Sequence, residues 1–291
     1  TLARTKARAG LPLDELRARA ELEMVAGADR LVASSVSEAK DLIRLYGAKR
    51  SRICIANPGV DLRLFQPRSS AALRRRLGLQ GKRIVLFAGR LEPLKGADTL
   101  LDAVVTLFAD PSFADVRVLV AGDNSGDGSI EGGGERSRLE QRVKTAHIAQ
   151  RVRFLGAVPH RELADLYALA DLCVVPSRTE SFGLVALEAQ ALGTPVVASA
   201  VGGLTEIVED GVTGILVEGR DPHDFAVAIA RVLRDRELRE RMGAEARSRA
   251  TYFTWTRAVE RLSAIYDRAD REMLELPCGE PEAEVPQLIA G

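Results

Sequence analysis

The sequence predicts an α/β protein built on parallel sheets. Short runs rich in β-branched residues alternate with longer segments of helical periodicity, which is the pattern of consecutive strand–helix units. Several expected strands, such as 84–87 and 118–120, show no polar alternation, as strands covered on both faces do. At 291 residues the chain is long enough for one or two such domains.

A first, short α/β series occupies the chain up to residue 81. Its expected elements are a helix over 13–27, a strand over 30–34, a helix over 37–46 and a strand over 52–56. Asn57-Pro58-Gly59 is a strong turn signal, and a short helix over 71–77 is closed by Gly78. We interpret 57–81 as a linker between two domains.

A second series begins at Arg83 and contains enough strands for a complete doubly wound domain over about 82–250. The expected strands are 83–88, 116–121, 151–155, 171–175, 195–199 and 214–217. The expected helices are 97–109, 136–147, 160–169, 183–192, 203–209, 222–234, 236–250 and 255–273. The last residues, 277–291, are rich in proline and glutamate, and we expect a disordered tail there.

Composition excludes several classes of protein. The 41 basic residues balance 41 acidic ones, which argues against a nucleic-acid binder. Three widely separated cysteines form no CxxC or Cys/His cluster, which argues against a zinc site. The sequence has no signal peptide and no apolar run of membrane-spanning length, so we expect a cytoplasmic protein without a membrane span.

The first candidate for chemistry is the segment 89–96, which follows the first strand of the second series. Ligands of a doubly wound sheet bind outside the carboxyl ends of its strands. Arg90 and Lys95 lie there, five residues apart on a tight loop, and two such cations suit a diphosphate. A solvated turn that opens a helix explains the same loop.

The second candidate is the segment from Glu180 to Glu188, which follows the strand over 171–175. Glycine at the mouth of the next helix lets backbone N–H groups approach an anion or a sugar hydroxyl closely. Glu188 lies on the inner, apolar face of that helix, where a carboxylate needs a partner. A sugar diol is one suitable partner, and a salt bridge to a neighbouring helix is another.

A glycine-rich loop, 122–134, gives no phosphate-binding signature. It lacks the Gly-x4-Gly-Lys-Ser/Thr motif, and no complete Gly-x-Gly-x-x-Gly follows the first strand. A Rossmann-type oxidoreductase is therefore disfavoured.

The order of the loops resembles family 4 of the retaining glycosyltransferases. The motifs that carry the resemblance are Gly-Arg-x4-Lys-Gly at 89–96, Glu-x7-Glu at 180–188, Gly-Thr-Pro-Val-Val-Ala at 193–198, Val-Gly-Gly at 201–203, and the linker stretches 57–61 and 65–67. Within the family the chain is most similar to the inositol-phosphate transferases of mycothiol synthesis, and next to the sucrose-phosphate synthase group.

The resemblance implies a GT-B fold, with two Rossmann-like domains of which the second holds the nucleotide sugar. It divides the chain into a remnant of the acceptor-side domain (1–66), a complete donor-binding domain (67–253), a helix that packs back toward the first domain (254–276) and the tail (277–291). The acceptor side is therefore expected to be only partial.

The resemblance also implies roles for the donor-site residues. Arg90 and Lys95 would bind the diphosphate and stabilise the leaving nucleotide, so no metal or other cofactor is required. Glu180 would hold hydroxyls of the donor sugar rather than act as a nucleophile, and Glu188 would bind the ribose. The remaining donor contacts would come from the main chain of Val158 and from the segment Ser181, Phe182, Gly183 and Leu184.

On the acceptor side, the resemblance matches Thr1 and Arg17 to positions that bind an acceptor phosphate. Arg17 has an equally good local partner in Glu21, four residues later on the same helix. The histidines at 147, 160 and 223 match no functional position, and we interpret them as ordinary surface residues. A magnesium ion near the turn 167–170 is conceivable from the resemblance, but the side chains there do not support it.

The sequence thus predicts transfer of a hexose, such as N-acetylglucosamine, from a nucleotide sugar, expected to be UDP-linked, to a phosphorylated polyol or sugar. The chain begins at Thr1 without methionine, so we expect a fragment that binds the donor but transfers poorly alone. A non-catalytic nucleotide-sugar-binding module that needs a partner chain is the alternative. A homodimer is a further option that the sequence leaves open.

Overall fold

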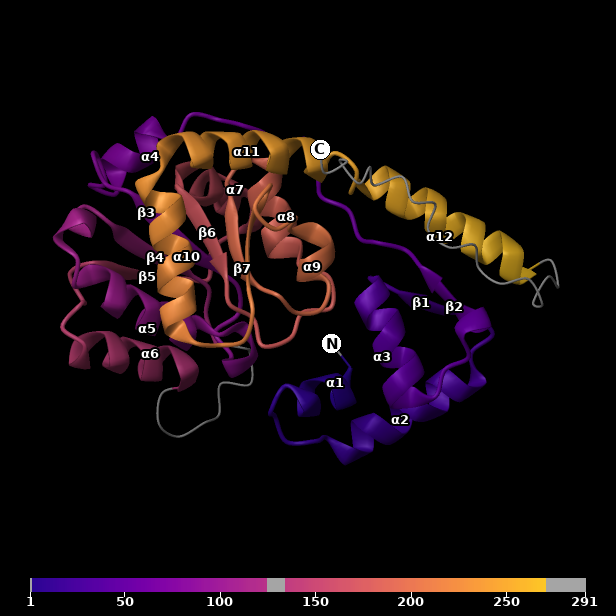
Figure 1. Cartoon of the computed structure of the whole chain (residues 1–291). Helices are drawn as coiled ribbons and strands as arrows, with labels where there is room; N and C mark the ends of the chain where they lie inside the picture. Colours follow the sequence, from indigo (N-terminus) through magenta and orange to yellow (C-terminus); the bar gives the residue numbers. More distant parts are fainter. Residues whose placement is uncertain (1, 125–133, 271–291) are drawn as a thin grey trace.

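The computed structural model describes residues 2–124 and 134–270 (Figure 1). Within them the chain forms two parallel sheets, one of six strands and one of two. The larger sheet consists of β3 (Ile84–Ala88), β4 (Arg117–Ala121), β5 (Val152–Gly156), β6 (Leu172–Val175), β7 (Val196–Ser199) and β8 (Gly214–Val217). The expected α/β fold is confirmed, and each predicted strand agrees with the observed one to within one residue at either end.

The strand order of the larger sheet creates a topological switch point. The order is β5-β4-β3-β6-β7-β8, so the chain starts in the middle, builds outward to β5 and then returns to the other side of β3. The connections from β3 and β6 therefore leave the sheet in opposite directions. A crevice opens at such a point, outside the carboxyl ends of the strands, and it is where doubly wound sheets bind ligands.

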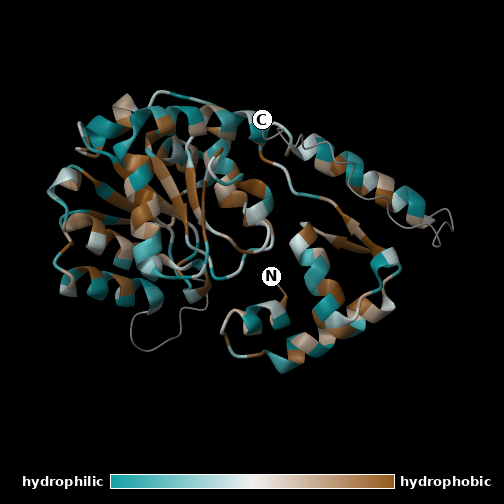
Figure 2. Cartoon of the chain, in the orientation of Figure 1, coloured by the Kyte–Doolittle hydropathy of each residue, from teal (hydrophilic) through white to brown (hydrophobic). Residues whose placement is uncertain are grey.

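Helices cover both faces of this sheet, which explains why its strands read as continuous apolar runs. All five residues of β3 are buried. One apolar cluster lies against α5, α6 and α10, and a second lies against α7, α8 and α9. Figure 2 shows the apolar strands between helices whose outer faces are polar. The helices are α5 (Ala97–Phe108), α6 (Gly134–Thr145), α7 (His160–Leu169), α8 (Leu184–Ala191), α9 (Leu204–Ile207), α10 (Pro222–Arg234) and α11 (Arg236–Ala250).

The amino-terminal part of the chain forms a smaller unit around the two-stranded sheet. A small apolar cluster holds its elements together. They are α1 (Ala3–Arg8), α2 (Glu15–Gly27), β1 (Leu31–Ala33), α3 (Val36–Tyr46) and β2 (Ile53–Ile55). The sequence did not predict α1, which is only six residues long and has one buried residue.

Buried Glu21 ties this small unit together. Its carboxylate accepts a hydrogen bond of 2.9 Å from the backbone N–H of Ala3, one of 2.8 Å from Arg17, and another from the hydroxyl of Tyr46. Burial alone raises the pKa of Glu21, but the bonds from Tyr46, Ala3 and Arg17 outweigh burial and lower the pKa. Three helices are thereby joined at one side chain.

The two parts lie side by side, and the chain crosses between them twice (Figure 1). The outward crossing, near Val60, pairs with the returning crossing at Thr254, and the N–H of Val60 donates to the carbonyl of Phe253. A Cβ on Gly59 would lie 2.1 Å from the backbone nitrogen of Trp255, so the two crossings can touch only because residue 59 is glycine. The linker also contains α4 (Ala71–Arg76).

The last described helix, α12 (Trp255–Asp270), follows the second crossing. Arg261 on α12 donates to the side-chain oxygen of Asn57 at 2.9 Å, at the start of the linker. Trp255, Val259 and Tyr266 on this helix are each more than half exposed. The expected tail, 277–291, lies outside the described residues, as does most of the glycine-rich loop.

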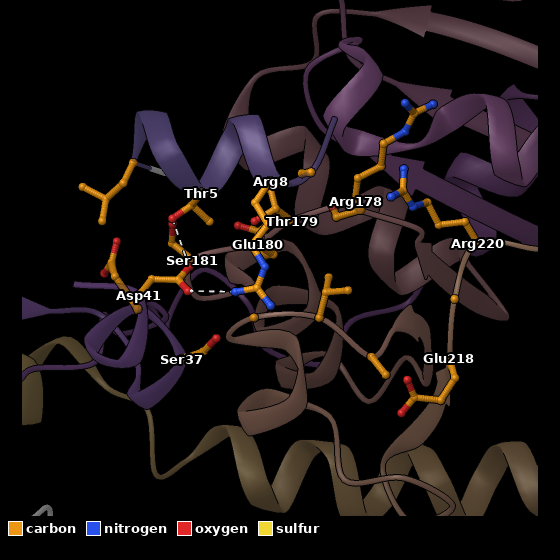
Figure 3. A pocket seen from close by; sticks show the side chains of 18 residues that line it. Thr5, Arg8, Ser37, Asp41, Arg178, Thr179, Glu180, Ser181, Glu218 and Arg220 are labelled. Carbon is orange, nitrogen blue, oxygen red and sulfur yellow. Dashed lines mark hydrogen bonds and ion pairs between the residues drawn. The ribbon is translucent and has the colours of Figure 1, made fainter. Parts of the chain in front are cut away.

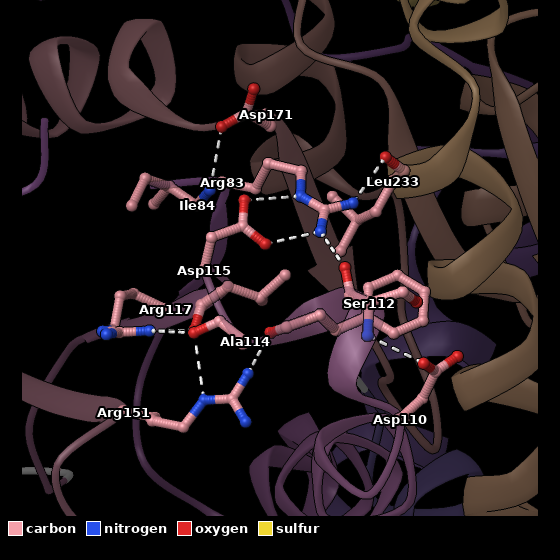
Figure 4. A network of polar contacts seen from close by, with 12 residues as sticks. Arg83, Ile84, Asp110, Ser112, Ala114, Asp115, Arg117, Arg151, Asp171 and Leu233 are labelled. Carbon is pink, nitrogen blue, oxygen red and sulfur yellow. Dashed lines mark hydrogen bonds and ion pairs between the residues drawn. The ribbon is translucent and has the colours of Figure 1, made fainter. Parts of the chain in front are cut away.

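The amino edge of the large sheet is closed by a polar network in which the arginines already have partners (Figure 4). Arg83 donates to both carboxylate oxygens of Asp115, at 2.8 and 2.5 Å, and to the carbonyls of Ser112 and Leu233. The hydrogen-bonded guanidinium of Arg83 holds the pKa of Asp115 below its ordinary value. The guanidinium of Arg83 already donates to protein acceptors, so we interpret this edge as structural. The candidate site lies at the opposite edge.

Candidate functional site

Three loops meet at the carboxyl edge of the sheet, and glycines let their backbones touch. A Cβ on Gly96 would lie 2.0 Å from the carbonyl oxygen of Pro176, and a Cβ on Gly202 would lie 1.8 Å from that of Glu180. The next residue, Gly203, donates its N–H to the same Glu180 oxygen at 2.9 Å. The loops after β3, β6 and β7 are therefore held in contact at the switch point.

An ion pair joins two of these loops across the crevice. The ammonium of Lys95 lies 2.7 Å from a carboxylate oxygen of Glu180, and both side chains are mostly shielded from solvent. Arg90, by contrast, is 63% exposed and lies 3.2 Å from its neighbour Glu92. Exposed pairs of this kind contribute little free energy, so Arg90 can exchange Glu92 for another anion at small cost.

The amino end of α8 faces the same crevice and carries no side-chain cap. Its N-cap is Gly183 in the left-handed conformation, with φ of 106°, and Leu184 begins the helix. The uncapped N–H groups and the helix dipole favour an anion or an oxygen acceptor there. The ring of Phe182 is buried and packs edge-on against Phe253, with 5.9 Å between ring centroids.

Glu188 lies one turn further along α8 and has two protein partners, both on α7. The ring nitrogen Nε2 of His160 lies 2.9 Å from one carboxylate oxygen, and the hydroxyl of Tyr167 donates to the other at 3.1 Å. Burial, followed by the nearby Glu188 charge, raises the pKa of Tyr167 and that of Cys173. The neighbouring-helix partner that the sequence left open is thus present, although it includes a histidine that we had interpreted as an ordinary surface residue.

His160 is a site residue that sequence reasoning missed. It is the first residue of α7 and follows the loop that contains Val158, after β5. A helix-start histidine gives no sequence signal of a partner 28 residues away. His223 is the second residue of α10 and is exposed, and His147, two residues beyond the end of α6, has a positive φ of 56°.

A pocket of about 370 Å³ opens beside Glu180, between the two parts of the chain (Figure 3). One wall comes from the loops after β6, β7 and β8, and the other wall comes from α1 and α3. Thr5 donates to Asp41 at 3.0 Å on the second wall. On the first wall, the hydroxyl of Ser177 and the Nε of Arg178 are buried and have no hydrogen-bond partner among the described residues. The sequence did not identify this pocket, because α1 was not predicted.

Hydrogen bonds between the two parts hold the pocket walls together. The hydroxyl of Ser35 donates to the carbonyl of Ser181 at 2.6 Å. The carboxylate of Glu206, on α9, accepts from the backbone N–H groups of Val36 and Ser37 at 3.1 and 3.0 Å. These are the free N–H groups at the start of α3, so Glu206 stabilises that helix end from the other part of the chain.

Of the two expected acceptor residues, only Arg17 is among the described residues. Thr1 lies outside the described residues. Arg17 forms the local pair with Glu21, at 2.8 Å between Nε and the carboxylate oxygen, and it is not among the residues that line the pocket. The acceptor role of these two residues stays a prediction.

The described part of the chain supports no metal site. It contains no group of three or more histidine, cysteine, aspartate or glutamate side chains that could hold an ion. At the turn over 167–170, the carbonyl of Tyr167 already accepts from the N–H of Ala170 and, at 2.8 Å, from the hydroxyl of Thr194. The carbonyl of Tyr167 thus already accepts two hydrogen bonds. No helix of the described residues is long and apolar enough to span a membrane.

Comparison with known proteins agrees with this geometry. The family of glycosyl transferases group 1 matches residues 69–249. D-inositol 3-phosphate glycosyltransferase from Geodermatophilus obscurus is 49% identical over 265 residues, which cover 90% of this chain and 57% of that protein. The chain thus spans little more than half the length of this relative.

Two solved structures are also similar. Sucrose-phosphate synthase from Thermosynechococcus elongatus superposes with a TM-score of 0.81 at 33% identity, covering 93% of this chain and 66% of that one. Anabaena HepE, solved in complex with UDP-glucose, superposes with a TM-score of 0.78 at 25% identity, covering 87% of this chain and 68% of that one. Family match, relatives and fold agree that the chain belongs to the glycosyl transferases group 1 family.

Proposed function

We propose that this glycosyltransferase binds a UDP-linked hexose, such as UDP-N-acetylglucosamine, at the carboxyl edge of its large sheet. One observation carries the proposal: Lys95 and Glu180 form an ion pair of 2.7 Å beside the uncapped amino end of α8, at the switch point of the sheet. A cation, a carboxylate and free N–H groups in one crevice can bind the diphosphate and the hydroxyls of a nucleotide sugar. The relative crystallised with UDP-glucose supports the choice of nucleotide.

Arg90 and Lys95 bind the diphosphate in this proposal. Lys95 is already held at the site by Glu180, and exposed Arg90 exchanges Glu92 for a phosphate oxygen. As the glycosidic bond breaks, negative charge grows on the leaving diphosphate, and two fixed cations stabilise that charge. The chemistry at this step needs charge stabilisation only, which the two side chains supply.

Glu180 and the start of α8 orient the donor sugar. A carboxylate held by Lys95 can still accept hydrogen bonds from sugar hydroxyls, because each of its oxygens has two lone pairs. Ser181, Phe182, Gly183 and Leu184 contribute backbone groups at the same point. We assign Glu180 binding and orientation, with the acceptor entering on the face of the departing phosphate, so that the anomeric configuration is retained.

The nucleoside lies deeper, between β5 and α8. Glu188 accepts the ribose hydroxyls, and the main chain of Val158 contacts the base. Val158 is only partly buried and lies on the loop that directly precedes α7, so its backbone groups lie near the Glu188 partners on that helix.

The acceptor enters from the pocket between the two parts of the chain. Arginine side chains and the unpaired groups of Ser177 and Arg178 line that pocket. The relative named D-inositol 3-phosphate glycosyltransferase suggests a phosphorylated polyol, and a phosphorylated sugar fits the same chemistry. Because the chain spans 57% of that relative, we propose that residues 1–291 bind the donor yet transfer poorly without a larger acceptor side.

Isothermal titration of residues 1–291 with UDP tests the donor site. We expect saturable 1:1 binding. Glu188→Ala should weaken binding about tenfold by loss of the ribose contact, and Arg90→Ala should weaken it about fivefold or more, with a larger loss at low salt.

Glu237→Ala is the matched control, because this glutamate is exposed on α11, away from the edge loops. A folded parent chain that shows no affinity for UDP would refute the proposed function. Parent-like binding by both site variants would refute the residue assignment alone. A transfer assay with UDP-N-acetylglucosamine and D-inositol 3-phosphate then tests the poor activity of this chain, and turnover typical of an intact enzyme would contradict it.

A further inference from the structure

His160 connects the ribose-binding carboxylate to the linker between the two parts of the chain. Its Nε2 lies 2.9 Å from Glu188. Its ring packs edge-on against Phe65, with 4.9 Å between centroids and 64° between planes. Phe65 belongs to the linker, is 1% exposed, and also contacts the ring of Tyr167 at 6.1 Å. The two side chains that hold Glu188 are thus both fixed by one buried aromatic ring.

The hydrogen-bonding capacity of Glu188 matches a vicinal diol once these partners are counted. An ionised carboxylate offers about four lone-pair sites, two on each oxygen. His160 occupies a site on one oxygen and Tyr167 occupies a site on the other. One site remains on each oxygen, so two neighbouring hydroxyls can be accepted without displacing either partner.

The arrangement also fixes which way the carboxylate faces. A carboxylate only accepts, so the His160 nitrogen that faces it carries the proton. With both oxygens tethered to α7, rotation of the carboxylate about its terminal bond is restricted. The glutamate side chain is 13% exposed, so little water is available to replace a lost partner.

We propose that His160 is a positioning residue, which together with Tyr167 presents the Glu188 carboxylate to the 2′- and 3′-hydroxyls of the bound nucleotide. This inference rests on the proposed function, because it takes Glu188 as the ribose ligand. It gives a role to a histidine that resembles a surface residue in sequence and is 60% exposed in structure. The ribose itself covers the exposed ring edge when the nucleotide binds.

The test compares two probes, UDP and 2′,3′-dideoxy-UDP, by calorimetric titration of residues 1–291. The parent should bind UDP more tightly than the dideoxy analogue. His160→Ala should weaken UDP binding about five- to tenfold, which is the size of the typical net contribution of one hydrogen bond. The affinity for dideoxy-UDP should stay within about twofold, because that ligand makes no diol contact.

Two further variants separate positioning from folding. His160→Gln places an amide donor near the former Nε2 and should restore most of the preference for UDP. His223→Ala removes an exposed histidine from the first turn of another helix, α10, and should change neither affinity. Because His160 is largely exposed, its variants should also keep the parent melting temperature within a few degrees.

The outcomes are separable. If His160→Ala lowers the affinity for UDP and for dideoxy-UDP equally, the inference is overturned in favour of a general structural role. Unchanged or tighter UDP binding by His160→Ala would overturn it as well. His160 would then either make no contribution to UDP binding or compete with the ribose for Glu188. A parent chain that binds neither ligand would refute the proposed function and this inference together. If the parent binds UDP and His160→Ala binds it equally well, only this inference is refuted.

Discussion

In the proposed function Glu180 faces the donor sugar, and Gly202→Ala tests whether Gly202 is what lets it do so. The added Cβ would lie 1.8 Å from the Glu180 carbonyl oxygen, whereas real Cβ contacts essentially never fall below 3.0 Å. The backbone of Glu180 must therefore retreat by about 1.2 Å, the difference between these two distances. That movement breaks the 2.9 Å bond from the Gly203 N–H and pulls the carboxylate away from Lys95.

The cost has two parts. Residue 202 has a φ of 56°, and an L side chain in this left-handed region costs about 1–2 kcal/mol. Loss of the buried backbone hydrogen bond adds about 1–2 kcal/mol. We expect Gly202→Ala to lower the free energy of unfolding by about 2–4 kcal/mol, measured by urea denaturation.

Gly211→Ala is the matched control. Residue 211 has a φ of 74°, and a Cβ added there would meet nothing within 4 Å, so this variant carries the backbone strain without the collision. Gly202→Ala should exceed it in destabilisation and should also reduce the preference for UDP-N-acetylglucosamine over UDP, because the sugar contact is lost and the nucleotide contacts remain. Equal destabilisation by the two variants, with an intact sugar preference, would refute the reasoning.

Two further predictions concern the smaller unit and its contact with the larger one. Glu206→Ala removes the acceptor of two N–H groups at the start of α3, and with it a contact between the two units. The units should then separate more, and small-angle scattering should show a larger radius of gyration; an unchanged scattering curve would contradict this role. Burial and the bond to Glu21 raise the pKa of Tyr46 to about 12, above its ordinary value of 10. The stability that the protonated Tyr46 contributes is therefore complete below pH 10 and is lost as the pH rises from 10 to about 12. Urea denaturation at pH 9 and 11 should show this loss in the parent and a smaller one in Tyr46→Phe; equal losses would contradict it.

The sequence by itself determined the large sheet, because its strands are recognised by local signals. Runs of β-branched residues covered on both faces contain no polar alternation, and glycine or proline marks their ends. The expected donor loops followed from the same reading, since parallel strands bring their carboxyl ends to one edge. Arg90, Lys95, Glu180 and Glu188 therefore needed no knowledge of long-range contacts to be placed at that edge.

Local alternatives were harder to decide from sequence. Arg17 could bind an acceptor phosphate or pair with Glu21, and only the folded chain showed that the pair forms, because Glu21 is buried and holds Ala3 and Tyr46 as well. The helix α1 was missed for a related reason. A segment of six residues with one buried side chain has little periodicity, and its position depends on a carboxylate 18 residues away.

The contacts that complete the site were decided by the tertiary structure alone. His160 contacts Glu188, 28 residues away in sequence, and packs against Phe65 from the linker. Contacts between residues so far apart in sequence cannot be predicted from the local pattern. The pocket between α1, α3 and the edge loops arises in the same way, from surfaces that meet only after both parts have folded. Strands and loops are predicted from neighbouring residues in the sequence. The partners of a buried carboxylate depend instead on which helices the sheet brings together. For this reason the sequence located Glu188 but not the side chains that hold it.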